Sequence, residues 1–444
     1  MAATVVAELV GLRERFRVVR QRSIRLCSPL TPEDMMVQSC PEASPAKWHL
    51  AHTAWFFESF LLKEFLPGYR LFNTDFPWLF NSYYQTFAEF PDKRLRASFS
   101  RPALDEVLRY REHVDEGIER LLESGLHEDA QRQVAAILIL GLNHEEQHQE
   151  LLLTDIKHAL YTNPLQPAYL GKDLEAKEAE AAPLEFFSYE GGLMEIGQNE
   201  TDSANPGGFG FDNERPRHRV WLEPFKIASR LTTCREFAEF IEDGGYSRPE
   251  LWLSAGWQTV QDEGWQAPLY WRRRGANRNS DRDSVEEEWA IGGLRGKRLL
   301  SEVEACPVTH VSFFEADAYA RWKGLRLATE AEWESVAATV PVEGNLLESG
   351  RLEPVAIQSG RSFDEPAQLF GDCWEWTSSA YLGYPGFVPL AGSLGEYNGK
   401  FMSGQMVLRG GSCVTPAKHI RASYRNFFPP ETRWQFSGIR LASS

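Results

Sequence analysis

Hydrophobic residues recur at helical spacing through residues 1 to about 165, mixed with charged positions. The pattern predicts a helix over Val5–Leu26, and Pro45 opens a second helical pattern that continues through WHLAHTAWFFESFLLKEF. A third helix is predicted from about Leu104 to Glu123, and a fourth from about Glu128 to Tyr161. Four long amphipathic helices favour an up-and-down bundle, a fold that builds metal sites from inward-facing side chains.

The pattern changes after the fourth helix. A charged, Ala-rich stretch, GKDLEAKEAEAAPLE, is typical of a linker, and short apolar pieces punctuated by glycine follow it. Helical spacing returns only at Thr233–Asp243 and Ser312–Lys323, and residues 260–300 are predicted to be a surface excursion. We therefore expect an α+β multidomain protein. Its predicted parts are a helical bundle over 1–165, a linker over 166–184 and a mixed α+β domain with much irregular structure over 185–444.

Composition limits the classes of function. The 444 residues are 43% hydrophobic and 25% charged, as in ordinary globular proteins, and the formal charge of -16 argues against binding to nucleic acid. The six cysteines are scattered without a C-x-x-C pair, which indicates a reduced chain. No secretory leader is visible, and no apolar run reaches the roughly 18 residues that a membrane span needs. We expect a cytoplasmic protein that neither enters a membrane nor binds nucleic acid.

The predicted fourth helix carries the segment HEEQH. His144 and His148 are four residues apart, so they project from one face of the helix as a ready pair of metal ligands. The segment also fits the H-E-x-x-H pattern of zinc proteases, in which Glu145 would be the general base. The protease interpretation is disfavoured because no third ligand follows at the expected distance; His158 lies ten residues on.

The third ligand is expected on the second helix, where His49 and His52 are three residues apart. That spacing places them on neighbouring sides of a helix, and the apolar surroundings of His52 favour it as the inward-facing one. Three histidines leave coordination positions open for substrate and O2, which suits non-haem Fe(II). Zinc would also bind three histidines, and the ligands alone do not separate the two metals.

The second half resembles the formylglycine-generating-enzyme-like (sulfatase-modifying-factor) domain. Its motifs occur in that family's order: GGLMEIG, ERPRHRV, PVTHVSFFEADAYARWKGLRLATEAEWE, GDCWEWT, LRGGS and SGIRLA. Formylglycine formation itself is not expected, because Cys413 stands where that fold usually has Trp and no second cysteine follows it. The first half looks like a DinB-type bundle. The two domains in this order, with WHLAH and HEEQHQE, resemble the iron-dependent sulfoxide synthases of ergothioneine biosynthesis.

The resemblance implies a reaction and a set of residues. It implies that His52, His144 and His148 bind Fe(II), and that O2 drives C–S bond formation between hercynine (Nα-trimethylhistidine) and cysteine or gamma-glutamylcysteine, with oxidation of the sulfur to a sulfoxide. The active site is expected between the two domains. The residues implied for the hercynine pocket are Gln147, Tyr397, Asn426 and Phe427.

The chain departs from the actinobacterial members at the catalytic tyrosine. Their tyrosine lies three residues before the one matching Tyr397, where this chain has Leu394. The adjacent Tyr83 and Tyr84, between the second and third helices, are the expected replacement, because a phenol with a pKa of about 10 is a competent acid at neutral pH. Which of the two acts stays open.

A second departure concerns the thiol. Phe428 replaces an acidic residue that helps to bind gamma-glutamylcysteine in the actinobacterial members, which leaves free cysteine plausible. The strip Lys93–Arg101 lies where the family places its carboxylate-binding arginines, and a guanidinium fork suits a carboxylate. Arg94, Arg96 and Arg101 are the candidates, with Arg96 preferred.

Two other functions remain open at this point. One is a zinc-dependent, DinB-like thiol transferase that needs no oxygen, and the other is a non-catalytic module that binds metal or hercynine. The sequence also leaves open the thiol preference, the oligomeric state and whether the Gly371–Asp372 loop holds a structural calcium ion.

Overall fold

The computed structural model describes residues 2–82, 84–85, 89–171, 180–199, 209–273, 288–357, 364–396 and 398–444. These residues form two compact units. The bundle unit comprises the chain to Asn163, with residues 209–212 and 388–396 and the pair 398–399. The mixed unit comprises the remaining described residues. The predicted boundaries 1–165, 166–184 and 185–444 stay a prediction, and each unit is described by itself below.

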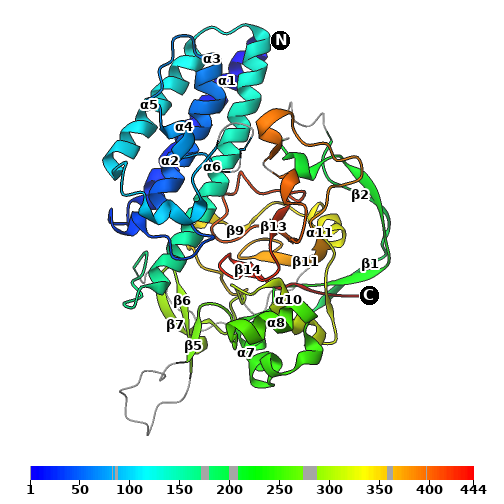
Figure 1. The fold of residues 1–444 in the computed structure, drawn as a ribbon. Coiled ribbons are helices and arrows are strands. Elements are labelled where there is room, and N and C mark those ends of the chain that lie inside the picture. Colours follow the sequence, from blue (N-terminus) through cyan, green and yellow to red (C-terminus); the bar gives the residue numbers. More distant parts are fainter. Residues whose placement is uncertain are drawn as a thin grey trace. The chain divides into compact units, whose positions relative to one another are not determined.

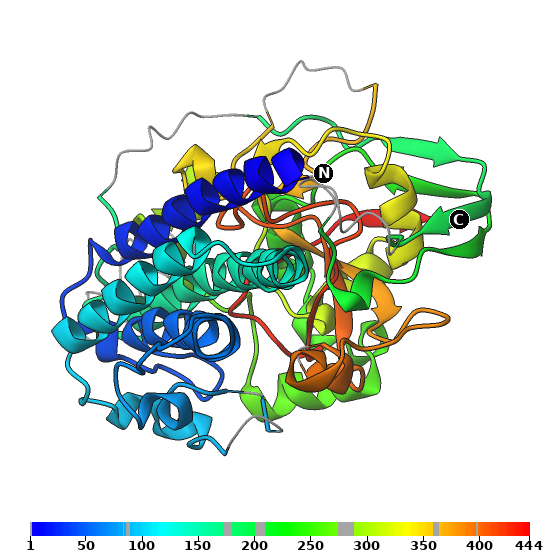
Figure 2. The ribbon, with the colours of Figure 1, turned by 90° about the horizontal axis from the view of Figure 1, so that it is seen from above.

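Four long helices build the bundle unit, and they lie side by side in both ribbon views (Figure 1 and Figure 2). Helix α1 packs on α6, and α2 packs on both α5 and α6. The predicted four-helix arrangement is therefore confirmed, with ends close to those expected. The helices are α1 (Ala2–Cys27), α2 (Ala46–Phe57), α5 (Leu104–Glu123) and α6 (Glu128–Thr162).

Helix α2 is the central element, and all twelve of its residues are buried. Pro45 precedes its first residue, where a proline costs no helical hydrogen bond. After Phe57 the helix continues as a π-helical turn, η2 (Glu58–Leu62), and ends in α3 (Lys63–Phe65). Such turns are uncommon and are often found at functional sites. Smaller elements complete this unit: η1 (Asp34–Met36), α4 (Phe76–Leu79) and η3 (Lys93–Ser98).

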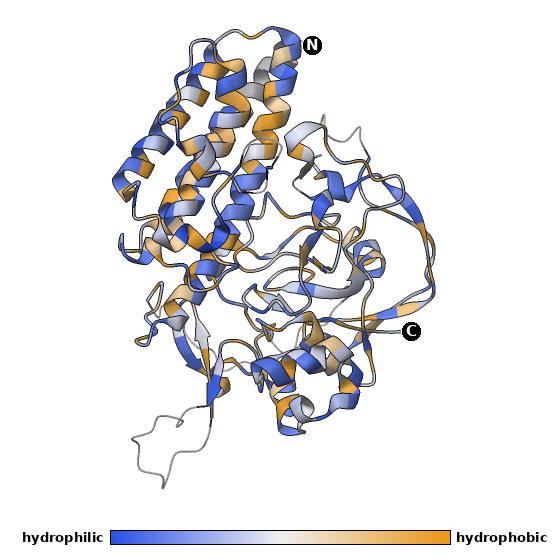
Figure 3. Ribbon diagram, in the orientation of Figure 1, coloured by the Kyte–Doolittle hydropathy of each residue, from blue (hydrophilic) through white to orange (hydrophobic). Residues whose placement is uncertain are grey.

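Several small sheets and short helices make up the mixed unit, which confirms the α+β expectation. In Figure 3 the bundle helices combine hydrophobic and polar positions, whereas the apolar stretches of the mixed unit are short. One four-stranded sheet has the order β1 (Phe186–Tyr189), β4 (Phe225–Ala228), β15 (Leu441–Ser443), β8 (Arg326–Leu327). The other has the order β13 (Asn426–Phe428), β12 (Met406–Arg409), β11 (Trp374–Ala380), β14 (Ser437–Gly438). Two further sheets have two strands each: β2 (Gly192–Ile196) pairs with β3 (His218–Leu222), and β9 (Gly344–Asn345) pairs with β10 (Phe370–Gly371).

Two sequence predictions for the mixed unit are wrong. The unit contains more helices than the expected two, because short helices such as α11 are set by local capping instead of a long apolar stripe; Thr329 and Glu332 form a reciprocal capping box there. The ends of the stretch 260–300 are also not a surface excursion, because Trp271 and Trp289 are buried in a three-stranded sheet; its centre, 274–287, lies outside the described residues. The helices are α7 (Cys234–Glu242), α8 (Ser254–Glu263), α9 (Leu300–Val303), α10 (Phe313–Trp322) and α11 (Glu330–Ala337), and the strands of that sheet are β5 (Trp271–Arg273), β6 (Trp289–Gly293) and β7 (Gly296–Leu299).

Among the described residues, every helix is too short or too polar to cross a membrane.

Candidate metal centre

Three buried histidines meet in the middle of the bundle unit. His52 comes from α2, and His144 and His148 come from consecutive turns of α6. One ring nitrogen of each lies within 4.8 Å of the others. Their ring centroids are 4.6–5.0 Å apart. The predicted triad is therefore brought together, in the part of the chain that the structure describes.

The ring of His52 is held on three sides. Its Nδ1 lies 2.6 Å from the carbonyl oxygen of Phe80, which can only accept, so Nδ1 carries the proton. Trp48 and Trp55 stack on the two sides of the ring, at centroid distances of 4.4 and 5.3 Å and interplanar angles of 13° and 12°. Nε2 then keeps its lone pair, and it is buried without a hydrogen-bond partner among the described residues. A buried, unpaired acceptor is costly unless a ligand completes it, so the site fits a metal ion.

Electrostatics also favour ligation. Burial lowers the pKa of His52 and His148 well below its usual value, and it lowers the pKa of His144 to about 3. Neighbouring charges act on the pKa as well: His144 lowers the pKa of His52 and His148, and Glu145 raises that of His144. All three rings are neutral at physiological pH, which is the form that binds a metal.

Glu145, the would-be protease base, faces a different cluster. Its carboxylate accepts hydrogen bonds from Arg20 (2.9 Å), Arg111 (2.8 Å) and Ser23 (2.6 Å). Burial opposes the charged form, but the two guanidinium groups outweigh it and hold the pKa of Glu145 at about 2. A carboxylate with this pKa and both oxygens engaged is a poor general base, so the geometry gives the protease interpretation no support.

Of the two predicted acid tyrosines, the structure describes one. Tyr84 is buried, and its ring lies 5.4 Å from Trp55 and 5.4 Å from Phe60. Trp55 in turn stacks on His52, as does Trp48. We call the rings of Trp48, Trp55, Phe60 and Tyr84 the aromatic wall of the triad. Tyr83 lies outside the described residues.

The three predicted arginines have different surroundings. Arg96 is buried, stacks on the indole of Trp48 at 3.4 Å, and donates to Ser44 Oγ and Ser82 Oγ at 2.8 and 2.9 Å. Arg94 is exposed and paired with Asp92 at 2.5 Å, and Arg101 is exposed and donates to the carbonyl of Ser100. Burial beside the triad's aromatic wall keeps Arg96 the strongest candidate for a substrate carboxylate.

The residues predicted for the hercynine pocket and the thiol lie on both units. Gln147 is half-buried on α6 of the bundle unit. Asn426, Phe427 and Phe428 form β13 of the mixed unit; Phe427 stacks on Tyr381 at 4.0 Å and Phe428 contacts Trp434. Tyr397 lies outside the described residues, so the proposed pocket stays a prediction.

The segment with the missing tyrosine belongs to the bundle unit. Leu394 lies in a short 3-10 helix, η9 (Gly392–Glu396), which clusters with the residues that carry the triad. Asp212 anchors this segment by accepting hydrogen bonds from Asn398 Nδ2 at 2.7 Å and from the backbone N–H of Leu390 at 3.2 Å. Leu394, the position where the resemblance implies a tyrosine in the actinobacterial members, therefore lies in the unit that carries the three histidines.

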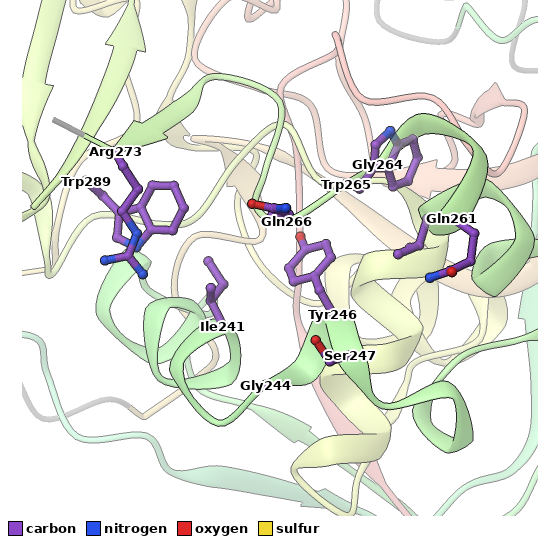
Figure 4. Close-up of a pocket in the computed structure, with 11 residues that line it drawn as sticks. Ile241, Gly244, Tyr246, Ser247, Gln261, Gly264, Trp265, Gln266, Arg273 and Trp289 are labelled. Carbon is purple, nitrogen blue, oxygen red and sulfur yellow. The ribbon is translucent and has the colours of Figure 1, made fainter. Parts of the chain in front are cut away.

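The mixed unit has features of its own that lie apart from the predicted residues. Asp372, in the loop for which the sequence leaves a structural calcium ion open, accepts N–H bonds from Asn345, Gln368 and the backbone of Val355. A pocket of about 400 Å³ is lined by residues including Tyr246, Trp265, Gln266, Arg273 and Trp289 (Figure 4).

Residues that support the triad were missing from the sequence interpretation. Trp48 and Trp55 lie four residues before and three after His52, a spacing that places them on its side of α2. Asp155 lies seven residues after His148, two turns along the same face of α6, and it bonds His49. Helical spacing could have indicated these positions, but the pairing across helices could not be derived from it.

Comparisons with known proteins agree with the architecture. Residues 172–349 and 365–444 match the sulfatase-modifying factor enzyme 1-like domain, and residues 15–152 match the DinB superfamily. The chain is 32% identical to hercynine oxygenase of Mycobacterium tuberculosis, over 95% of this chain and 96% of that protein. It is 31% identical to hercynine oxygenase of Mycolicibacterium smegmatis, over 97% and 98% of the two chains. Hercynine oxygenase of Mycolicibacterium thermoresistibile is 34% identical over 53% of this chain and 54% of that protein.

Proposed function

The chain belongs to the hercynine oxygenase family, and on that basis we propose that it is a sulfoxide synthase that joins hercynine to a cysteine-containing thiol at Fe(II), with O2 as the oxidant. The thiol is cysteine or gamma-glutamylcysteine. As an oxidoreductase of ergothioneine biosynthesis it would break one imidazole C–H bond and the thiol S–H bond. A C–S bond and an S–O bond form, and the second oxygen atom leaves as water, so atoms and electrons balance.

One observation carries the metal part of the proposal: the buried Nε2 of His52, unpaired among the described residues, at the centre of a neutral three-histidine cluster. His52, His144 and His148 would hold the ion. When bound, iron supplies oxygen activation and a common attachment point for the thiol and the imidazole. The surrounding rings of Trp48 and Trp55 keep the ligand His52 oriented and exclude water from its faces.

Tyr84 is proposed as the acid that replaces the missing phenol at Leu394. It is buried in the aromatic wall that contacts His52 through Trp55. A phenol in this position would hold a proton at its hydroxyl oxygen and deliver it to the developing sulfoxide or water. Tyr83 keeps the same proposed role as its alternative.

Substrate binding is proposed from charge and shape. The guanidinium of Arg96 would bind the thiol substrate's carboxylate, with Arg94 and Arg101 as weaker candidates, and Phe428 would favour cysteine over the larger dipeptide. The quaternary ammonium of hercynine suits aromatic faces such as Tyr397 and Phe427. Gln147 and Asn426 would complete that pocket with polar contacts.

The test is reconstitution with Fe(II), followed by hercynine with cysteine or with gamma-glutamylcysteine. We expect O2 uptake that requires both substrates, and a product whose mass equals the sum of the two substrates plus O2 minus water. Loss of uptake with both thiols would refute the proposal. Product formation with Zn(II) in the absence of O2 would instead support a thiol transferase, and metal binding without any product would support a binding module.

The acid is tested separately with Tyr84→Phe, with Tyr69→Phe as the control because the Tyr69 hydroxyl bonds Glu58 within the bundle. We expect Tyr84→Phe to slow sulfoxide formation while iron binding is unchanged. Unchanged sulfoxide formation would remove Tyr84 from the mechanism and leave Tyr83 to be tested in the same way.

A further inference from the structure

His148 is held by another histidine. Its Nδ1 lies 2.8 Å from Nδ1 of His49, whose Nε2 lies 3.0 Å from a carboxylate oxygen of Asp155. All three side chains are buried. Two imidazole nitrogens at this distance share one proton, so one ring must donate and the other must accept.

Asp155 decides the direction of this chain of hydrogen bonds. An ionised carboxylate only accepts, and the same Oδ2 also receives the backbone N–H of Ser44 at 2.8 Å. In a neutral His49 ring the single proton therefore lies on Nε2, toward Asp155, and Nδ1 is left as an acceptor. His148 must then donate from Nδ1, which leaves the lone pair on Nε2.

We infer that Asp155 and His49 form a positioning relay that fixes His148 in the Nδ1–H tautomer and presents its Nε2 lone pair for metal binding. The inference rests on the metal site of the proposed function. It assigns roles to two residues that do not themselves bind the ion. His49, three residues from His52 on α2, thus serves the ligand on the other helix.

His52 and His148 are oriented by different contacts. His52 donates to a neutral carbonyl and is stacked between two indoles, whereas His148 donates into a chain that ends on a carboxylate. A carboxylate at the end of such a chain raises the basicity of the ligand and orients its ring. The relay also continues past the carboxylate, because Ser44 accepts through Oγ a hydrogen bond from Arg96. The proposed substrate arginine and the metal ligand are thus connected through Ser44 and Asp155.

Asp155→Asn is the most direct test because it keeps the shape and removes the charge. The amide oxygen can take the place of Oδ2 and accept from His49 and Ser44, but without the negative charge the relay no longer raises the basicity of His148. We expect the affinity for Co(II), used as a spectroscopic probe in place of iron, to fall about 10- to 100-fold. The visible absorption of the Co(II) complex should change as well, because one ligand is weakened.

The matched control is His113→Asn. His113 is on α5 and its Nε2 bonds the carbonyl oxygen of Arg70 at 3.0 Å, so the substitution removes a histidine hydrogen bond on a helix that carries neither the triad nor Asp155. We expect its Co(II) affinity and spectrum to match those of the wild type. His49→Asn should weaken Co(II) binding as Asp155→Asn does, and the double variant should be no weaker than the stronger single variant, because both changes break one relay.

Each outcome decides a different claim. Wild-type protein that binds no Co(II) would overturn the metal site, and with it the proposed function. Wild-type binding that is unchanged in both single variants, or effects that multiply in the double variant, would overturn the relay alone. Should Asp155→Asn fail to fold by circular dichroism, His49→Asn decides by the same affinity and spectrum.

Discussion

Helix α6 turns two buried polar faces toward the rest of the bundle, one with His144 and His148 and the other with Glu145 and Gln149. On the second face every carboxylate oxygen of Glu145 is engaged by Arg20, Arg111 or Ser23. The first face meets His52, whose Nε2 is buried and unpaired among the described residues. The two faces are one residue apart in sequence, and they differ in that both oxygens of the Glu145 carboxylate have donors, whereas His52 Nε2 has no hydrogen-bond partner among the described residues.

The contrast between the two faces indicates that one stabilises the fold and the other binds a ligand. A buried carboxylate that is neutralised by two guanidinium groups needs no further cation, so Glu145 specifies how α1, α5 and α6 pack. A buried neutral acceptor without a partner, as His52 Nε2 is among the described residues, costs free energy in the folded chain and recovers it when an ion binds. Removing a side chain should therefore affect stability on one face and metal binding on the other.

The largest effect is expected for Glu145→Gln. The change removes the carboxylate that pairs with Arg20 and Arg111. Arg20 keeps its ion pair with Asp115, but Arg111 keeps none among the described residues, and breaking a buried ion pair typically costs about 3–5 kcal/mol. We expect urea unfolding, followed by far-UV circular dichroism, to show a loss of this size. Iron content per folded chain should stay that of the wild type, because Glu145 does not face the triad.

An equal loss of iron and stability in Glu145→Gln would contradict the separation of the two faces. The control is Asp105→Asn, which removes an exposed i,i+4 ion pair with Arg109 on α5. Such pairs contribute less than about 1 kcal/mol, so the variant should unfold close to the wild type.

The next effect concerns a buried carboxylate with no charged hydrogen-bond partner among the described residues. Burial raises the pKa of Asp372 to about 6, although Asn345, Val355 and Gln368 donate to it. An acid whose pKa is raised on folding adds stability that is complete below its usual pKa near 3.8 and is lost as the pH rises through about 6. Two pKa units correspond to about 3 kcal/mol.

We therefore expect the free energy of unfolding of the mixed unit to fall between pH 4 and pH 7 by up to about 3 kcal/mol. The slope should disappear in Asp372→Asn, and urea unfolding at several pH values measures it. An equal slope in the variant would show that other groups cause it. Glu145, with its arginines, is the opposite case, since its pKa is held at about 2.

His144→Gln should show the converse of Glu145→Gln. Loss of one of three ligands should weaken Fe(II) binding by about 100-fold, equal to about 2.7 kcal/mol. The metal-free variant should lose less stability than Glu145→Gln, because no buried charge is left unpaired. Iron titration and urea unfolding of the metal-free protein measure the two quantities. A variant that keeps its iron affinity would remove His144 from the ligand set.

The sequence was sufficient to predict the long helices and the three histidines, which depend on regular spacing. The i,i+4 pair His144 and His148 and the apolar setting of His52 predicted the triad, since helical geometry turns spacing into a shared face. The long helices followed for the same reason. The short elements α8 and α11 were missed, because turns, caps and tertiary packing decide such elements more than periodicity does.

The supporting residues could not be derived in the same way. His49 was weighed against His52 as a ligand, and its actual partners, His148 and Asp155, lie about a hundred residues away on another helix. Glu145 was considered as the general base of the disfavoured protease interpretation, and its network depends on Arg20 and Arg111 meeting it from two other helices. Contacts across helices are set by packing, which spacing within one helix does not encode.

The smallest effect is expected for Ser23→Ala. The Ser23 hydroxyl donates to Glu145 at 2.6 Å and accepts from Gln149 at 3.0 Å, but both arginines remain on the carboxylate when it is removed. A hydrogen bond to an ionised group typically contributes about 1.5–3 kcal/mol, and we expect the lower end, about 1.5 kcal/mol, because both arginines stay bound. Ser28→Ala, at an exposed serine near the end of the same helix, is the control. Urea unfolding measures the difference. A loss as large as that of Glu145→Gln would mean that the arginines alone do not hold the charge, and that the network depends on each of its donors instead of on its paired charges.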